Sequence, residues 1–233
     1  MTILMYHRVA EDGPPGLARW RVTPGAFAEQ MAHLARQKYR TIGLMEWLER
    51  ARSDDPAALD RRVVLTFDDA YLDFVTAALP VLRKYGFGST LYVPTGHVGG
   101  AADWDRAFGT PAPLMSWEQV AAAADEGVEI GAHTVTHPFL TELGLDQVRE
   151  EVTQSRKVLE AKLGRVVPTF AYPYGKHSPE IDAIVAEAGF ALAVTTDPES
   201  VLPLAAGRLE VMGTDTRESF AERLAAAQPR TVL

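Results

Sequence analysis

Short apolar segments alternate with amphipathic segments along almost the whole sequence. The run at 63–67 has the length and β-branched content of a buried strand, whereas 145–163 repeats its apolar residues at helical spacing and ends before a glycine. We expect strands over 2–6, 39–42, 63–67, 89–93, 128–132, 166–171, 190–195 and 207–211. We expect helices over 24–36, 44–52, 72–85, 116–126, 145–163, 179–188 and 217–227.

Strands that alternate with helices in this way form parallel sheets. About seven such units favour an α/β fold that closes or nearly closes into a (β/α)7-type barrel, and one domain spanning 1–233 suits this length. Chemistry in such barrels gathers at the carboxyl ends of the strands. The loops between strands and helices are therefore the places to look for a site, including the Gly- and Pro-rich stretch 94–113. Residues 52–60 are expected to form a surface loop.

The composition excludes several classes of function. A net charge of −8 argues against nucleic acid as the partner, because phosphate binding needs a basic surface. The absence of cysteine excludes disulfides, thiolate nucleophiles and cysteine-ligated metals. The sequence has no apolar run long enough for a transmembrane helix and no signal peptide at its start. We therefore expect a cytoplasmic protein, or an exported one if a leader precedes this sequence.

Two short motifs follow predicted strands and carry the side chains of a metal-dependent hydrolase. Asp68 and Asp69 come directly after 63–67, and His133 and His137 follow 128–132. Two imidazoles at a helical spacing of four and one carboxylate would supply three ligands, and the second carboxylate would remain as a base. Two alternatives stay open, since paired aspartates often cap a helix and two loop histidines can be unrelated.

The motifs together resemble the NodB-homology polysaccharide deacetylases, carbohydrate esterase family 4. The resemblance rests on TFDD at 66–69, HTVTH at 133–137 and FAYPYG at 170–175, in the order and spacing of that family. It extends over nearly the whole chain. It implies a distorted α/β barrel and a metal-dependent N-deacetylase acting on an N-acetylated amino sugar.

The resemblance also implies a function for individual residues. Asp68 would be the general base, and Asp69, His133 and His137 would hold the metal, usually Zn²⁺ but with Co²⁺, Ni²⁺, Mn²⁺ or Fe²⁺ also accepted. The backbone N–H of Tyr174 would stabilise the oxyanion. We place the other candidate substrate contacts at Pro173, Arg208 and Trp104.

The sequence departs from the commonest family pattern in three places. Ala171 stands where the third motif usually has an arginine that pairs with the catalytic aspartate, and Arg208 is the candidate substitute. The fourth motif of the family, an Asp-Trp segment, has no clear match. No histidine lies beyond His177, so the late general acid is missing, and His7 at the end of the first strand is the candidate replacement. Poly-N-acetylglucosamine deacetylases, a sub-branch of the family, begin in a similar way.

Aromatic side chains matter because the face of a sugar ring stacks on them. Tyr174 and one of the tryptophans are expected to form the pocket wall, with Trp104 favoured over Trp117, which is better placed for the core. Two other functions remain open: hydrolysis of a different non-peptide amide, as in allantoinase-like relatives, and a metal-containing carbohydrate-binding module without catalysis. The oligomeric state is not predicted.

Overall fold

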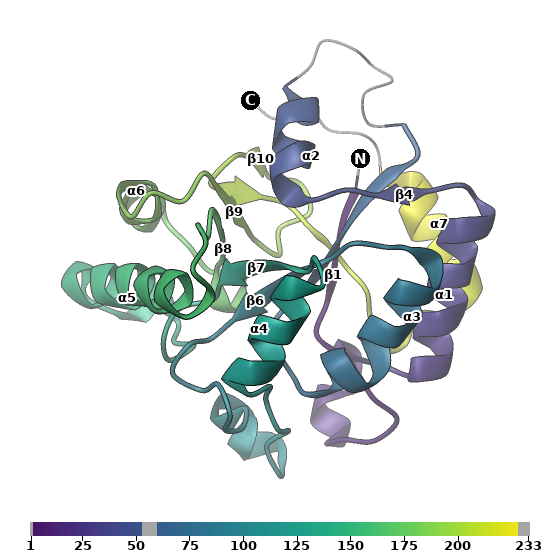
Figure 1. The fold of residues 1–233 in the computed structure, drawn as a ribbon, viewed down its shortest axis with the longest axis horizontal. Coiled ribbons are helices and arrows are strands. Elements are labelled where there is room, and N and C mark those ends of the chain that lie inside the picture. The colour runs from purple at the N-terminus through teal and green to yellow at the C-terminus, as the bar shows by residue number, and fades with distance from the viewer. Residues whose placement is uncertain (1, 53–59, 228–233) are drawn as a thin grey trace.

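The structure is a computed structural model that describes residues 2–52 and 60–227. Most of the loop expected over 52–60 lies outside the described residues. The strands are short and mostly buried, and the helices surround them (Figure 1). The strands of the central path are β12 (Leu209–Glu210), β1 (Thr2–Tyr6), β5 (Arg62–Phe67), β6 (Thr90–Val93), β7 (Glu129–Ala132), β8 (Thr169–Ala171) and β9 (Leu192–Val194).

These seven strands are parallel and pair in the order β12–β1–β5–β6–β7–β8–β9. The predicted α/β fold with a parallel sheet is therefore confirmed. Further short strands extend the sheet or form a separate small one: β4 (Arg40–Thr41) beside β5, β11 (Ala205–Ala206) beside β9, β10 (Val201–Leu202) antiparallel to β11, and β2 (Arg8–Val9) beside β3 (Arg21–Val22).

The sheet curls round so that its two ends approach each other. β11 pairs with β9 at one end of the path, and β12 pairs with β1 at the other end. Only Gly207 and Arg208 separate β11 from β12 in the sequence. A link of two residues spans only about 7–10 Å, so the edges at β9 and β1 must lie close together. This curvature matches the distorted barrel expected from the sequence.

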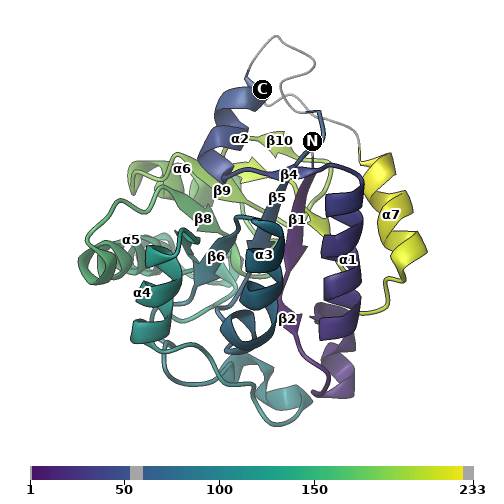
Figure 2. The same cartoon turned by 45° about the vertical axis from the view of Figure 1, so that its right-hand side comes forward.

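Helices pack around the outside of the strands, as Figures 1 and 2 show. The long helix ends where the sequence predicted, because Gly164 takes the left-handed conformation that stops it. Ser116 and Gln119 form a capping box that starts another helix. The helices of this layer are α1 (Pro24–Arg36), α3 (Leu79–Tyr85), α4 (Trp117–Asp125), α5 (Leu145–Leu163), α6 (Pro179–Glu187) and α7 (Arg217–Ala226).

Helix α2 (Leu44–Ala51) lies across the end where the strands begin (Figures 1 and 2). Its residues Trp47 and Leu48 are buried in an apolar cluster with Ile3 and Val64 of the first strands. The Glu129 carboxylate accepts a hydrogen bond from the backbone N–H of Leu44 at 3.1 Å and so satisfies the start of α2. α2 therefore covers the amino end of the strands.

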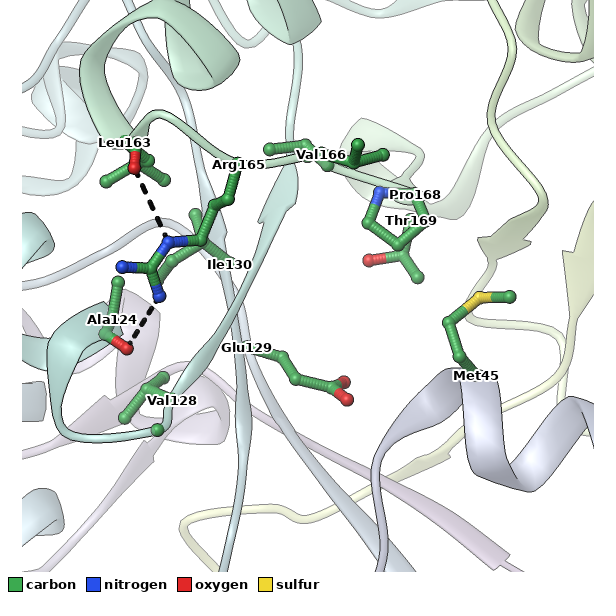
Figure 3. Close-up of a pocket in the computed structure, with 12 residues that line it drawn as sticks. Met45, Ala124, Val128, Glu129, Ile130, Leu163, Arg165, Val166, Pro168 and Thr169 are labelled. Atoms are coloured by element: carbon green, nitrogen blue, oxygen red, sulfur yellow. Dashed lines mark hydrogen bonds between the residues drawn. The ribbon is translucent and has the colours of Figure 1, made fainter.

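A cavity of about 290 Å³ lies beside Glu129 at this amino end. Figure 3 shows the Glu129 carboxylate and Met45 facing it, and Arg165 bonded to the carbonyls of Ala124 and Leu163. Thr169, the first residue of β8, also lines it. The carboxyl ends of the same strands lie at the opposite edge of the sheet.

Several predicted boundaries were wrong for local reasons. The helix expected over 72–85 begins as a π-helical segment, η3 (Phe74–Ala78), before α3. Pro80 lacks the N–H that a regular helix would use at this point. The strand expected over 166–171 starts only at Thr169, since Pro168 cannot donate to a ladder. The stretch 94–113, expected to be irregular, contains a 3₁₀ helix, η4 (Asp103–Phe108).

Candidate active site

Asp68 and Asp69 follow β5 directly and are almost completely buried, at 3% and 4% exposed. Asp69 and Ala70 have φ angles of 74° and 54°, in the left-handed region that non-glycine residues rarely adopt. The sharp turn brings both neighbouring carboxylates to one cavity. Neither caps the helix that follows, which has no side-chain cap, so the capping alternative is wrong.

His133 and His137 follow β7 in a bent loop that is not helical, so the expected helical turn is wrong. Thr134 and His137 have φ angles of 65° and 58°. Despite the different backbone, both Nε2 atoms approach Asp69 Oδ1, at 3.3 Å for His133 and 3.2 Å for His137. Nδ1 of His133 lies 2.7 Å from the carbonyl oxygen of Ala171. Donation from Nδ1 to that carbonyl leaves the Nε2 lone pair free for a ligand.

These three side chains fit a divalent metal ion. One ligand atom from each of Asp69, His133 and His137 lies within 4.8 Å of the others. Tetrahedral zinc ligands at about 2.0–2.1 Å from the ion are about 3.3 Å apart, close to the two carboxylate–imidazole distances. Asp69 Oδ1 is buried and has no hydrogen-bond donor among the described residues. A cation is the partner that such a donor set lacks.

Arg208 reaches the Asp68 carboxylate from the junction that joins the two ends of the sheet. Its Nη1 and Nη2 donate to Asp68 Oδ1 and Oδ2, both at 2.7 Å, in a bidentate pair. Nη1 also donates to Thr66 Oγ1 at 3.1 Å, and Nε donates to the carbonyl of Thr195 at 3.2 Å. Arg208 is 1% exposed, so its hydrogen bonds to the described residues fix the guanidinium at one place.

The electrostatic surroundings keep both aspartates ionised. Burial raises the pKa of the Asp68 carboxyl, but the charge and hydrogen bonds of Arg208, together with the charges of His133 and His7, bring the pKa below the ordinary aspartate value. Burial also opposes ionisation of Asp69, but the imidazoles of His137 and His133 hold its pKa well below the usual range. A charged carboxylate is the form that accepts a proton or binds a cation.

His7 follows the last residue of β1 and lines the same cavity as the two aspartates and the two histidines. β1 and β5 are neighbours in register from Thr2 with Val63 to Tyr6 with Phe67, which places His7 beside Asp68. Nδ1 of His7 is buried and has no hydrogen-bond partner among the described residues. The imidazole is therefore available for proton transfer in the cavity.

Tyr174 also lines the cavity and lies in a short 3₁₀ segment, η6 (Pro173–Gly175), with a φ of 58°. Its ring stands edge-on to His137, with centroids 4.8 Å apart, and stacks flat on Phe139 at 3.7 Å. Burial, followed by the charge of Asp69, raises the pKa of Tyr174 to about 12. Pro173 is buried and does not line the cavity.

Trp104 belongs to η4 in the long loop and stacks on His137, with centroids 4.3 Å apart. The next residue, Asp105, also lines the cavity and accepts a hydrogen bond from the hydroxyl of Tyr71 at 2.9 Å. Trp117 packs against the main core. The long loop thus brings an aromatic ring and a carboxylate to the cavity, and only the ring was predicted.

The cavity has a volume of about 600 Å³ and ends at a rim of exposed aromatic rings. Trp20 and Phe108 lie on two different 3₁₀ segments, η1 (Pro15–Trp20) and η4. These segments meet where Gly16 faces the Phe108 ring so closely that a Cβ would lie 2.8 Å from it. No repeated pattern in the sequence predicted that η1 and η4 would form this part of the cavity wall.

Glu151 on α5 is another residue that the motifs did not reveal. Its Oε2 accepts hydrogen bonds from the backbone N–H groups of Val135 and Thr136, at 2.8 and 2.9 Å, and its Oε1 accepts one from the Thr136 hydroxyl at 2.6 Å. It therefore holds the loop between His133 and His137. The sequence indicated this contact only weakly. Glu151 lies three residues after the buried Val148, at the border of the buried face of α5.

Comparisons of the sequence and of the structure with known proteins agree on one family. The sequence matches the polysaccharide deacetylase family over residues 56–193. It is 27% identical over 198 residues to YxkH of Bacillus subtilis (strain 168), covering 85% of this chain and 65% of that protein. It is 30% identical over 137 residues to the poly-beta-1,6-N-acetyl-D-glucosamine N-deacetylase of Escherichia coli (strain K12), covering 56% of this chain and 20% of that protein. The chain thus spans less than two thirds of the length of these relatives.

A solved structure is similar over its whole length. The Streptococcus pyogenes deacetylase PplD, in complex with acetate, superposes with a TM-score of 0.79 and 26% identity, covering 95% of this chain and 96% of that chain. The family match covers more than half of the sequence and includes all three motifs, at 66–69, 133–137 and 170–175. On this evidence, the chain belongs to the polysaccharide deacetylase family.

Proposed function

We propose that this protein is a metal-dependent hydrolase that removes the acetyl group from an N-acetylated amino sugar in a glycan or glycan precursor, with 1–233 acting as one catalytic domain. The observation that carries the proposal is the position of Asp68. A carboxylate paired with buried Arg208 adjoins the Asp69–His133–His137 group in one cavity. The similarity to a poly-beta-1,6-N-acetyl-D-glucosamine N-deacetylase supports the substrate class, and the similarity to the deacetylase PplD, which was solved in complex with acetate, supports the release of an acetyl group.

Asp69, His133 and His137 would hold the cation, which we propose is Zn²⁺, since nitrogen and carboxylate ligands in a set of three suit a catalytic zinc site. When bound, the cation would act as a Lewis acid on the amide carbonyl and lower the pKa of a water molecule. Co²⁺, Ni²⁺, Mn²⁺ and Fe²⁺ are alternatives, since geometry and availability decide between such ions.

The protein's own residues would carry the proton transfers. The Asp68 carboxylate, kept ionised by Arg208, accepts a proton from the attacking water. The His7 imidazole, near Asp68 at the end of β1, donates a proton to the leaving amine. The backbone N–H of Tyr174, held in a left-handed turn, donates to the oxygen that becomes negative during the reaction. Trp104 excludes water and forms part of the wall against which the acetamide packs.

Acetate release from N-acetylglucosamine oligomers tests the proposal directly. Metal-stripped protein is assayed with and without added Zn²⁺ or Co²⁺, and we expect acetate only with metal. Asp68→Asn should abolish turnover while the protein still binds metal by elemental analysis. Asp125→Asn, an exposed aspartate paired with Arg165, is the matched control and should retain full activity.

Each other result has a defined meaning. Turnover by Asp68→Asn would remove Asp68 as the base. Metal binding without acetate release from any sugar would favour a different amide substrate, and a panel of cyclic and linear amides would then find it. Metal and oligosaccharide binding without turnover of any amide would indicate a carbohydrate-binding module.

A further inference from the structure

Asp105 is a carboxylate in the active-site cavity to which the proposed reaction assigns no step. It lies in η4, next to Trp104, whose ring stacks on the metal-ligand candidate His137. Asp105 lines the same cavity as Asp68 and Asp69. A further acidic side chain in a cavity that already holds two carboxylates is electrostatically unfavourable unless it has a partner there.

Asp105 shares the lining of the cavity with His7, Asp69 and Tyr174. Burial raises the pKa of Asp105 and the hydrogen bond from Tyr71 lowers it. The charge of Asp69 also raises it, while the charges of His7 and Arg8 lower it. The charge of Asp105 in turn contributes, after burial and the charge of Asp69, to the raised pKa of Tyr174, which lines the same cavity. Because these residues line one cavity, a molecule bound there would lie close to Asp105.

Asp105 is held in place by a chain of contacts. The Tyr71 hydroxyl donates to Asp105 Oδ2 at 2.9 Å. The guanidinium of Arg8 lies over the Tyr71 ring at 5.4 Å, and Arg8 Nε bonds to Asp73 Oδ2 at 2.9 Å. An ionised carboxylate has about four lone-pair sites, and Tyr71 uses one of them. The others remain available to hydrogen-bond donors from a ligand.

We propose that Asp105 is a specificity-determining residue that accepts hydrogen bonds from ring hydroxyls of the sugar whose acetamide occupies the cavity. The inference rests on the proposed function and deepens it. A pyranose presents hydroxyl donors around its edge and an apolar face, and the pair of Asp105 and Trp104 presents a carboxylate beside an aromatic ring. A simple acyl substrate without ring hydroxyls gains nothing from the carboxylate.

The prediction is a change in substrate preference. In Asp105→Ala, the ratio of kcat/KM for N-acetylglucosamine oligomers to kcat/KM for 4-nitrophenyl acetate should fall roughly 10- to 100-fold, as expected for the loss of a hydrogen bond to a charged group. Most of the loss on the oligomers should lie in KM. Asp105→Asn keeps one acceptor oxygen and should give an intermediate ratio. Asp103→Asn, an exposed residue two positions away that pairs with Arg106, is the control and should leave the ratio unchanged.

The opposite results would overturn the inference. An equal loss of kcat/KM on both substrates would mean that Asp105 supports the loop or the chemistry. A shift in the alkaline limb of the pH profile of kcat/KM would mean that Asp105 acts through His7. An unchanged ratio would exclude contact with the sugar. Failure of the proposed function is seen separately in the wild-type protein, which would then hydrolyse the ester with metal and release no acetate from any oligomer. That result would also remove the sugar contact of Asp105.

Discussion

Replacing Arg208 tests how the buried ion pair at the base is stabilised. The Arg208 and Asp68 side chains are 0% and 4% exposed and share two hydrogen bonds of 2.7 Å. Removing one member of such a pair leaves the other charge buried without compensation, which destabilises a protein by about 3–5 kcal/mol. We expect Arg208→Met to lower the free energy of unfolding of the metal-free protein by this amount at pH 7.

The loss should depend on pH in a definite direction. In the wild-type protein the pKa of Asp68 is lowered. The ionised carboxylate therefore stabilises the fold above the unfolded pKa of about 3.9, and this stabilisation is lost as the pH falls through the folded pKa. Without Arg208, burial acts unopposed by the guanidinium and raises the pKa of Asp68 above about 3.9. The difference between variant and wild type should therefore be largest at pH 7 and shrink as the pH falls through the raised pKa.

Urea unfolding at pH 7 and pH 5, with the chelator EDTA present, measures both effects. The double variant Asp68→Asn with Arg208→Met should be more stable than Arg208→Met alone, because it has no unpaired charge. Arg149→Met, which breaks the exposed pair with Glu187, should lose less than about 1 kcal/mol. The reasoning is refuted if Arg208→Met lies within about 1 kcal/mol of wild type, or if its loss is equal at both pH values.

Three further predictions concern residues around the site. Glu151→Gln should weaken Zn²⁺ binding, measured by calorimetry, by about 10-fold or more, since the carboxylate holds the loop between the two histidines; unchanged affinity would count against this function. Phe139→Ala should lower kcat more than it raises KM, because Tyr174 loses the ring on which it stacks, and Phe139→Tyr should restore most of the activity; a change in KM alone would contradict this. Gly43→Ala should lower the melting temperature, with a loss of about 1–3 kcal/mol, because its Cβ would lie 1.9 Å from Glu129 Oε1; a melting temperature equal to that of wild type would show that the carboxylate can move aside.

Much of the fold could be predicted because helices and strands leave local patterns. The helix Leu145–Leu163 was predicted with both of its ends. Its apolar residues repeat at helical spacing, and Gly164, which ends it, follows directly in the sequence. The predicted starts of a regular helix and of a strand were wrong where a single proline determined them, at Pro80 and at Pro168. The wall formed by η1 was not predicted, because short 3₁₀ segments have no repeated pattern.

The motifs of the candidate site could also be found in the sequence, because each follows one strand and is only a few residues long. The sequence could not reveal the backbone that presents them. Five non-glycine residues with positive φ lie in these motifs or next to them: Asp69, Ala70, Thr134, His137 and Tyr174. Such conformations persist only where the surrounding structure enforces them, and they concentrate at functional sites.

The sequence alone thus determined the candidate donor set and the alternation of strands and helices, since both depend on residues close together in the chain. Only the tertiary structure decided which distant side chains complete the site. Arg208 meets Asp68 across 140 positions because the sheet curls until β12 lies beside β1. Asp105 reaches the cavity because Tyr71, 34 positions away, holds it there. Contacts of this kind depend on the closure of the sheet and the packing of its loops, which no short stretch of sequence specifies.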